Sequence, residues 1–323
     1  MDYNIVVASD ENYAAHMSTL IVSICENNIG HKIVMHIFDG GISDKTVRKI
    51  KTLENNYHQL HIIFYKVLEE DIMHWLGGNI TKDRSLSTFG RIFIPRLLDD
   101  KIERAVYFDV DAICCSEIEE LFKMDLEEYY IAGVQDCNFN RTKIAVGLNK
   151  NSNYINAGMI IWNLNACRKE NVVDSLVDFV RARNGRVVAM DQGTINGTLS
   201  DKIKIIHPRW NVLTPFFQMN SKQLKKFYGM NEYYSEKELS EAVQNPGFVH
   251  FVPNFTTRPW MKHCSHPLRK VYCKYRKMTP FSDYTLMPDN RDKKARMLSA
   301  LFHILPKTLF LSFYQNINRR KGL

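Results

Sequence analysis

Short apolar runs alternate with amphipathic segments of helical length along the first part of the chain. Strands are expected at Tyr3–Ala8, Lys32–Asp39 and Leu60–Tyr65. Helices are expected between them, at Tyr13–Glu26 and Ser43–Tyr57. Strands that alternate with helices predict an α/β fold, with a mainly parallel sheet covered by helices on both faces. In such sheets, ligands bind beyond the carboxyl ends of the strands.

The same alternation continues less regularly to about residue 260. Further helices are expected at Thr88–Leu98, Asn171–Arg183 and Asp191–Leu199, and further strands at Met159–Leu164, Ile203–Ile206 and Gly247–Val252. The segment Phe217–Ala242 is polar and rich in lysine, and we expect it to be a mobile excursion from the fold.

Two acidic residues, Asp109 and Asp111, follow the apolar run Val106–Phe108. Residues i and i+2 of an extended chain point to the same side, so the two carboxylates can converge at the end of a strand. Two carboxylates at one point repel each other unless a positive charge lies between them. A hard divalent cation that also holds phosphate oxygens is the usual solution. Alone the pattern is weak, because Asp-x-Asp also occurs in many surface loops.

The sequence lacks the patterns of two common nucleotide-binding folds. No G-x-G-x-x-G follows the first strand, which argues against a dinucleotide-binding fold, and no G-x-x-x-x-G-K-[ST] suggests a P-loop. An acid-bearing turn, Ala8–Tyr13, follows the first strand instead.

Length and composition indicate an ordinary globular protein. The 323 residues can bury a substantial core, and the apolar fraction is 45%. No run approaches the roughly 18 apolar residues of a membrane-spanning helix, and Met1–Asn4 lacks the pattern of a signal peptide. The seven cysteines are odd in number and scattered. We therefore expect a cytoplasmic protein without a disulfide framework.

The net charge of +8 is concentrated near the C-terminal end. Residues 285–323 contain eight Lys and Arg against two Asp, a balance of +6. Pro306 separates two amphipathic segments there, and their Leu and Phe side chains suit an anionic membrane surface on the inner face of the plasma membrane. A helix pair that packs on the body and exposes a basic face is an equally good interpretation. Nucleic acid is not an expected partner, because no recognition motif accompanies the charge.

Six motifs occur in a fixed order between Asn4 and Trp260. They are Ala8-Ser9-Asp10-Glu11-Asn12-Tyr13, Arg91, Asp109-Val110-Asp111, Asn156-Ala157-Gly158, Asp191-Gln192 and His250 with Arg258-Pro259-Trp260. Together they resemble the retaining glycosyltransferases of family 8, which include bacterial lipopolysaccharide galactosyl- and glucosyltransferases and the glycogenins. The resemblance implies a GT-A fold over residues 1–260, in which a Rossmann-like nucleotide domain merges with an acceptor-binding part. Residues 261–323 would form a basic, mostly helical extension.

The resemblance also implies a metal site. Residues that match Asp109, Asp111 and His250 bind Mn²⁺ in the family. Two carboxylates and one imidazole suit such an ion, and Mg²⁺ is an alternative. For His250 alone, a core histidine at a strand end would be the better interpretation, but the Arg-Pro-Trp segment that follows favours a ligand.

A UDP-sugar, UDP-glucose or UDP-galactose, is the donor that the resemblance implies. Asp10, Asn12 and Tyr13 would hold the nucleotide. Ser9, Asp10 and Asn12 could instead simply cap the following helix, and both interpretations can hold together. Arg91 and Asp191 would grip the donor sugar and diphosphate, with a structural ion pair as the alternative. Ala8, Val110, Asn156, Ala157, Gly158 and Arg258 would complete the donor site.

Gln192 would lie beneath the anomeric carbon, with Asp191 beside it as the second catalytic residue. A carboxamide is a poor nucleophile, so we favour attack from the face that the leaving group departs, with the leaving phosphate accepting the acceptor's proton. Asp136 would bind the acceptor. Water must be kept from the donor, and the loops Leu76–Ser87 and Phe217–Ala242 are candidate lids.

The chain departs from the family pattern after His250. The family has a glycine soon after the histidine and then Lys-Pro-Trp, whereas Phe251–Thr257 is longer, lacks glycine and precedes Arg258. Arg258 can still clamp a diphosphate, even in a bidentate manner.

The sequence thus predicts a metal-dependent retaining hexosyltransferase that acts on a glycan or glycolipid acceptor, foremost the lipopolysaccharide core. A transferase that extends glycans on a protein or a capsule precursor is an alternative. A non-catalytic nucleotide-sugar-binding protein is another, but it would have no need of Asp109, Asp111, His250 and Gln192 together.

Overall fold

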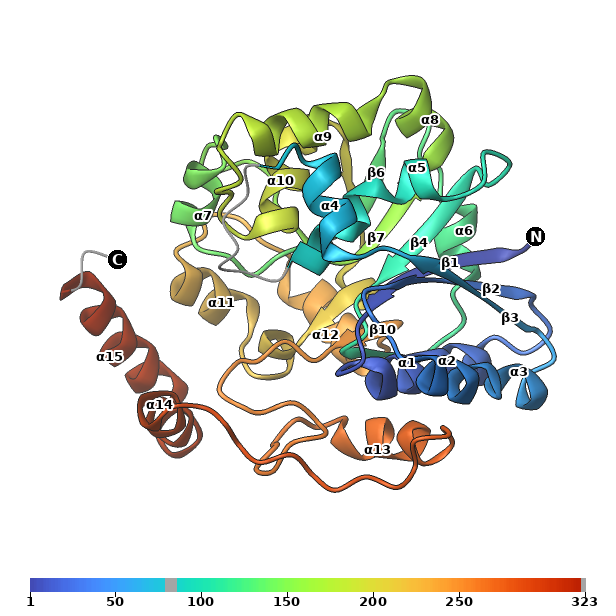
Figure 1. Cartoon of the computed structure of the whole chain (residues 1–323). Helices are drawn as coiled ribbons and strands as arrows, with labels where there is room; N and C mark the ends of the chain where they lie inside the picture. Colours follow the sequence, from blue (N-terminus) through green and yellow to red (C-terminus); the bar gives the residue numbers. More distant parts are fainter. Residues whose placement is uncertain (79–85, 321–323) are drawn as a thin grey trace.

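The computed structural model describes residues 1–78 and 86–320, and its centre is a seven-stranded sheet (Figure 1). The strand order is β3-β2-β1-β4-β7-β6-β8. Strands β3, β2, β1 and β4 are parallel, β7 runs antiparallel to both β4 and β6, and β8 is parallel to β6. The strands are β1 (Tyr3–Ser9), β2 (Ile33–Asp39), β3 (Leu60–Lys66), β4 (Arg104–Phe108), β6 (Ile131–Gln135), β7 (Ile155–Asn163) and β8 (Ile203–Ile205).

Helices cover both faces of this sheet (Figure 1). One face carries α1 (Ala14–Asn27), α2 (Asp44–Lys51) and α3 (Leu53–Asn56), and the other carries α4 (Glu69–Trp75), α5 (Ile94–Leu97), α8 (Leu164–Lys169), α9 (Val172–Arg181) and α10 (Met190–Leu199). Short helices α6 (Glu119–Lys123) and α7 (Asn140–Ala145) join further strands. The mainly parallel α/β fold expected from the alternation is therefore confirmed.

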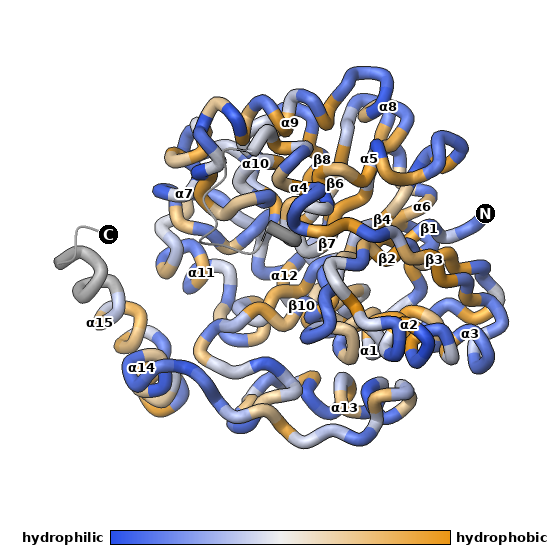
Figure 2. Tube along the Cα trace, viewed as in Figure 1, coloured by the Kyte–Doolittle hydropathy of each residue, from blue (hydrophilic) through white to orange (hydrophobic). Residues whose placement is uncertain are grey.

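Each strand contributes alternate side chains to two hydrophobic cores, because successive residues of a strand point to opposite faces. In β4, Val106 and Phe108 belong to the core on the α1 side, whereas Ala105 and Tyr107 belong to the core on the α9 side. Hydrophobic residues follow the central strands, and polar residues follow the outer turns (Figure 2). The phase of this alternation sends Asp109, the next residue, to the same side as Tyr107.

A small second sheet adjoins the first and carries His250. It consists of β5 (Ala112–Cys114), β10 (Phe248–His250) and β9 (Val212–Leu213), in the order β5-β10-β9. Strand β10 pairs antiparallel with β5, with His250 opposite Ala112. This pairing places His250 beside the residue that follows Asp111.

Three expectations about local structure are wrong. Thr88–Leu98 is not a single α-helix, because a 3-10 helix (Leu86–Phe93) precedes the single turn of α5, where Pro95 removes an amide donor. The strand expected at Met159–Leu164 begins earlier, at Ile155, so that Asn156, Ala157 and Gly158 lie inside β7. Phe217–Ala242 is not an irregular excursion, since it forms α11 (Ser221–Tyr228) and α12 (Glu236–Gln244).

The helices α11 and α12 both begin with a capping box. Asn220 and Gln223 exchange side-chain and backbone hydrogen bonds at the start of α11, and Ser235 and Glu238 do so at the start of α12. This segment is therefore regularly structured, and its role as a lid stays a prediction. Most of the other expected lid, Leu76–Ser87, lies outside the described residues.

The C-terminal region forms α13 (Arg269–Lys277), which packs on α1, and then a helix pair, α14 (Lys293–Ile304) and α15 (Lys307–Arg320). The apolar side chains Phe302, Phe310 and Leu311 of this pair are buried. The packed helix pair is therefore the structure that is observed. Other apolar side chains of the same pair, including Ile304 and Leu309, are exposed. Within residues 1–78 and 86–320, no helix is long and apolar enough to cross a membrane.

Candidate active site

The candidate site lies at the edge where β1 and β4 end and β7 begins. Beyond β1 the chain turns through Asp10 to Tyr13, and beyond β4 it continues into Asp109. Because β7 runs antiparallel to β4, its first residues lie at this same edge, and the Asp109 amide donates to the Gly158 carbonyl at 2.8 Å. The sheet alone thus brings together three motifs that are far apart in the sequence.

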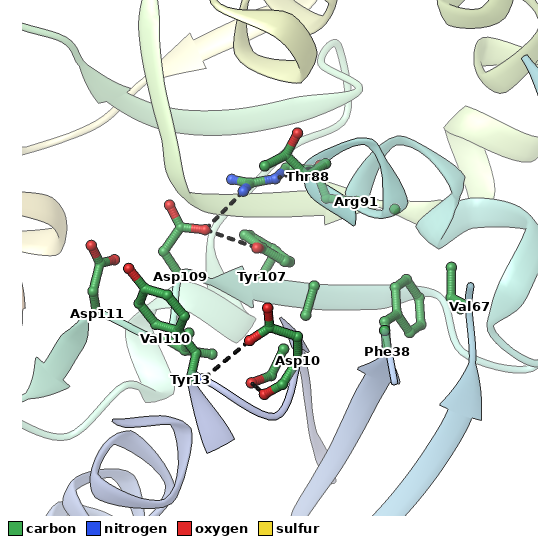
Figure 3. A pocket seen from close by; sticks show the side chains of 14 residues that line it. Asp10, Tyr13, Phe38, Val67, Thr88, Arg91, Tyr107, Asp109, Val110 and Asp111 are labelled. Atoms are coloured by element: carbon green, nitrogen blue, oxygen red, sulfur yellow. Dashed lines mark hydrogen bonds and ion pairs between the residues drawn. The ribbon is translucent and has the colours of Figure 1, made fainter. Parts of the chain in front are cut away.

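A pocket of about 390 Å³ opens at this edge (Figure 3). Figure 3 shows Asp10 and Tyr13 on one side, Asp109 and Asp111 at one end, and Arg91 above Tyr107. The pocket is lined by Ala8, Ser9, Asp10, Tyr13, Phe38, Gly40, Val67, Thr88, Gly90, Arg91, Tyr107, Asp109, Val110 and Asp111. Seven of the expected donor-site residues are among them.

Asn12 differs from its neighbours in the first turn. It is exposed, is not among the residues that line the pocket, and donates from Nδ2 to Asp10 Oδ2 at 3.4 Å. The other carboxylate oxygen of Asp10 accepts a hydrogen bond from the Tyr13 amide at 3.1 Å. Asp10 therefore shapes the turn before α1 and also faces the pocket, but no side chain of the described residues caps α1, whose N-cap is Tyr13.

Asp109, Asp111 and His250 converge at one end of the pocket. One ligand atom from each lies within 4.8 Å of the other two. His250 Nε2 is 3.0 Å from Asp111 Oδ1 and 3.7 Å from Asp109 Oδ2. Burial alone would raise the pKa of Asp111, but His250 and Arg258 hold it well below its usual range. Burial opposes charge on His250 too, yet the Asp111 carboxylate raises its pKa.

Gly158 makes room for His250. A Cβ atom at position 158 would lie 2.3 Å from His250 Cε1 and 2.4 Å from Nδ1, far inside van der Waals contact. The buried Nδ1 of His250 has no hydrogen-bond partner among the described residues. The imidazole thus lies directly against the backbone at Gly158, where any side chain would displace it.

The buried Arg91 side chain forms ion pairs with two carboxylates. Its Nη2 is 2.9 Å from Asp109 Oδ1, its Nε is 2.9 Å from Asp191 Oδ2, and its Nη1 donates to the Ala157 carbonyl at 2.6 Å. The guanidinium lies 4.4 Å from the centre of the Tyr107 ring, and the Tyr107 hydroxyl donates to Asp109 Oδ1. Asp109 Oδ1 is therefore fully engaged, and Oδ2 is left to face His250.

The pKa of Asp191 is raised to about 6. Burial is the main cause and the nearby Asp109 carboxylate adds to it, while Arg91 acts in the opposite direction. A raised pKa beside a paired arginine at a pocket is a feature of functional sites, although structural ion pairs also produce it.

Gln192 and Asn156 together hold Asp136. Gln192 Nε2 donates to Asp136 Oδ2 at 3.0 Å, and Asn156 Nδ2 donates to Asp136 Oδ1 at 3.2 Å. The Gln192 carbonyl oxygen accepts from the Ala157 amide at 3.0 Å. Burial raises the pKa of Asp136, against the effect of these two donors. The expected acceptor residue and the expected catalytic carboxamide are thus in direct contact.

Arg258 lies against the cluster of Asp109, Asp111 and His250. Its Nε and Nη2 lie 3.1 and 3.0 Å from the same oxygen of Asp111, Oδ2. Trp260, two residues later, stacks on the His16 ring at 3.9 Å, and His16 Nδ1 is 2.6 Å from the Tyr272 hydroxyl. The segment that contains Arg258 is therefore attached to the first turn of α1.

Sequence reasoning missed three residues that support the site. Tyr107 lies two residues before Asp109 on the same face of the strand, and this spacing alone could have revealed it. Asn211 donates to the Asn156 side chain at 2.9 Å, and His16 positions Trp260. The latter two come from elements whose approach no motif indicates.

Comparisons with known proteins agree with this geometry. The model of the family described as Glycosyl transferase family 8 matches residues 4–264. General stress protein A of Bacillus subtilis is 27% identical over 86% of this chain and 94% of its own length. Lipopolysaccharide 1,3-galactosyltransferase of Salmonella typhimurium is 24% identical over 88% of this chain and 81% of its own.

Solved structures show the same fold. The galactosyltransferase LgtC, in complex with donor and acceptor sugar analogs, superposes with a TM-score of 0.70 at 20% identity over 86% of this chain and 96% of that one. The bifunctional glycosyltransferase WbbM gives a TM-score of 0.70 at 18% identity over 87% of this chain, which spans about half of WbbM (50%).

Proposed function

The chain belongs to glycosyl transferase family 8, and from this premise we propose that it is a metal-dependent retaining hexosyltransferase with UDP-glucose or UDP-galactose as its donor. The observation that carries the proposal is the convergence of Asp109, Asp111 and His250 at one end of the pocket that Asp10, Tyr13 and Arg91 line. A nucleoside diphosphate needs a cation beside its phosphates and a surface on which its base can stack. The carboxylate end of this pocket would hold the cation, and Tyr13 would stack on the base.

The residues of the cluster fit a divalent cation. Asp109 Oδ2 and the Asp111 carboxylate are hard oxygen donors, His250 supplies a neutral nitrogen, and this combination suits Mn²⁺, with Mg²⁺ as the second choice. When bound, the ion would act as a Lewis acid that neutralises charge on the departing diphosphate. Arg91 and Tyr107 both contact Asp109 Oδ1, and this fixes the direction in which Oδ2 points.

The donor would lie across the strand ends. Tyr13 would stack on the base and Asp10 would accept from it, while Arg91 and Asp191 would bind the sugar hydroxyls and diphosphate. Arg258 would leave Asp111 and bind the diphosphate, since a guanidinium pairs well with phosphate oxygens. The donor would rest on Ala8, Val110 and the backbone of Asn156, Ala157 and Gly158.

In this proposal transfer proceeds with retention, and Gln192 and Asp136 support it. The bond between the anomeric carbon and the phosphate oxygen breaks, the acceptor oxygen bonds to that carbon on the same face, and the acceptor proton passes to the leaving phosphate. The Gln192 carbonyl, oriented by the Ala157 amide, would stabilise the positive charge that develops on the sugar. Asp136 would position the acceptor hydroxyl.

The acceptor in this proposal is a bacterial surface glycan, and a lipopolysaccharide core is the first choice. The similarity to the Salmonella lipopolysaccharide galactosyltransferase supports it. Residues 1–260 would form the catalytic domain. Residues 261–323 would attach it to an anionic membrane surface through the exposed apolar and basic side chains of α14 and α15, including Ile304 and Leu309.

The test is UDP release from a panel of UDP-sugars with Mn²⁺, with and without a chelator. We expect release from UDP-glucose or UDP-galactose that the chelator abolishes and that Asp109→Ala loses. Asp178→Ala, an exposed carboxylate on α9, is the matched control and should retain activity. A wild-type protein that binds none of the UDP-sugars would contradict the proposal, and tight binding without turnover even with lipopolysaccharide core acceptors would favour a binding protein.

A further inference from the structure

The loop Phe251–Thr257 connects the expected metal ligand His250 to Arg258, and its tip points away from the pocket. The ring of Phe255 enters the C-terminal helix pair, where it stacks on Phe302 with a centroid distance of 4.4 Å and an interplanar angle of 14°. It also meets Phe310 edge-to-face at 5.1 Å. The C-terminal helices thus contact the active-site loop directly.

The backbone of Phe255 is held as firmly as its ring. Its carbonyl oxygen accepts hydrogen bonds from Ser299 Oγ at 2.5 Å and from His303 Nε2 at 3.0 Å, both on α14. Its φ of +48° lies in the left-handed region, which a bulky side chain rarely adopts and which costs free energy. Such a conformation persists only where surrounding contacts impose it. Here they come from α14, from Phe310 and Tyr314 of α15, and from Phe227 of α11.

The other end of the segment has a second anchor. Trp260 stacks on His16 and packs edge-to-face on Tyr13 at 6.5 Å, so it is attached to the start of α1. Arg258 lies between the two anchors, three residues after Phe255 and two before Trp260. With both anchors in place, its guanidinium reaches Asp111 Oδ2 at 3.0 Å. A segment this short allows Arg258 little freedom while both ends are fixed.

We propose that the C-terminal helix pair sets the position of Arg258 over the donor pocket, and that Phe255, Ser299 and Phe302 are positioning residues for donor binding. This inference rests on the proposed function in one respect, namely that Arg258 binds the diphosphate. None of the three residues touches the donor. They act by fixing the loop that brings Arg258 to it.

The test is a double-mutant cycle between the helix pair and Arg258. Phe302→Ala and the milder Ser299→Ala are made alone and in an Arg258→Ala background. Leu309→Ala is the matched control, because Leu309 belongs to the same helix pair but is 60% exposed. Two quantities are measured, the Mn²⁺-dependent dissociation constant for UDP and the hydrogen exchange of the amides in residues 251–258.

We expect Phe302→Ala to weaken UDP binding about tenfold, the equivalent of about 1.4 kcal/mol, and Ser299→Ala to weaken it less. Both effects should vanish when Arg258 is already alanine. The 251–258 amides should exchange faster in both variants, and Leu309→Ala should change neither quantity.

Two results would overturn the inference. One is unchanged exchange of residues 251–258 in folded Phe302→Ala and Ser299→Ala proteins, which would mean that the helix pair does not hold the loop. The other is a loss of UDP affinity that persists in full in the Arg258→Ala background, which would mean that the helices act elsewhere. A wild-type protein that fails to bind UDP contradicts the proposed function instead, and the exchange measurement still decides whether the loop and the helices are coupled.

Discussion

The two sides of the donor pocket are held by different interactions. On the sheet side, Arg91 lies buried between Asp109 and Asp191, and its position depends on ion pairs in a medium of low polarity. On the loop side, Arg258 is 27% exposed and depends on aromatic contacts that Phe255 and Trp260 make with other elements. Substitutions on the sheet side should therefore destabilise the whole fold. Substitutions on the loop side should weaken ligand binding and leave the fold intact.

The largest expected effect is on the sheet side. Arg91→Met would leave the buried Asp191 carboxylate and the half-buried Asp109 carboxylate without their arginine, and breaking a buried ion pair from one side costs about 3–5 kcal/mol. Urea-induced unfolding would measure it. Arg96→Met is the matched control, because the pair of Arg96 with Asp174 is 46% and 61% exposed, and it should change stability by about 0.5 kcal/mol or less. If both variants lost a similar free energy of unfolding, the buried ion pairs of Arg91 would not stabilise the sheet side more than an exposed pair does.

The next effect concerns the metal. Gly158→Ala would drive a methyl group into His250, so we expect Mn²⁺ affinity to fall about 10- to 100-fold, as it does when the support of a metal ligand is disturbed. Calorimetric titration with Mn²⁺ measures this. Gly90→Ala serves for comparison, since its Cβ would meet no existing atom closer than 3.8 Å. Undiminished Mn²⁺ binding by the Gly158 variant would argue against His250 as a ligand.

A smaller effect with two opposite signs is expected on the loop side. Arg258→Met removes a cation that competes for Asp111, so Mn²⁺ should bind about two- to fivefold more tightly without nucleotide, as suits a partly exposed ion pair. UDP should bind more weakly in the presence of Mn²⁺, because a diphosphate contact is lost. Titrations with each ligand separate the two effects. Changes of the same sign would mean that Arg258 does not move between the carboxylate and the phosphate.

A final prediction tests the second anchor through pH. Burial lowers the pKa of His16 to about 3, and it lowers those of His36 and His266 to about 4. At these three histidines the unfolded chain binds more protons than the folded protein below about pH 6.5, so their contribution to stability is complete above that pH and falls as the pH decreases towards 4. Asp191, whose pKa is raised to about 6, acts in the opposite direction in this window.

Each buried histidine contributes a slope of up to about 1.4 kcal/mol per pH unit in this window. His16→Phe, which keeps a ring for Trp260, should flatten the dependence by one such contribution, and thermal melts between pH 4 and 7 would show it. The exposed His58→Phe should leave the slope unchanged. A steep slope that persists in His16→Phe would mean that His16 does not remain neutral at this anchor.

Much of the sheet side could be predicted from the sequence. Period-two alternation fixes which face of β4 carries Tyr107 and Asp109, and the strand end fixes the edge at which they lie. The family resemblance supplied His250, which comes from a separate sheet and has no local pattern of its own. The start of β7 was predicted too late in the sequence. Antiparallel pairing with β4 and β6 extends this strand to include Asn156, Ala157 and Gly158, and no local pattern indicates that pairing.

The loop side could not be predicted to the same extent. The segment 217–242 was read from its polarity alone, although the capping boxes at Asn220 and Ser235 were visible in the sequence. The longer loop after His250 was recognised as unusual, but its anchor at Phe255 depends on α14, more than 40 residues later. Contacts of this kind arise from the packing of elements, and no local pattern encodes them.

The pairing of β4 with β7 also determines where the protein can tolerate changes in chain length. The Asp109 amide and the Gly158 carbonyl form a rung of the ladder, so one inserted residue in either strand would turn every following side chain to the opposite face. An insertion in Phe251–Thr257 would shift no strand. Changes in length can therefore accumulate in this loop while Asp109 and Asp111 keep their places at the end of β4.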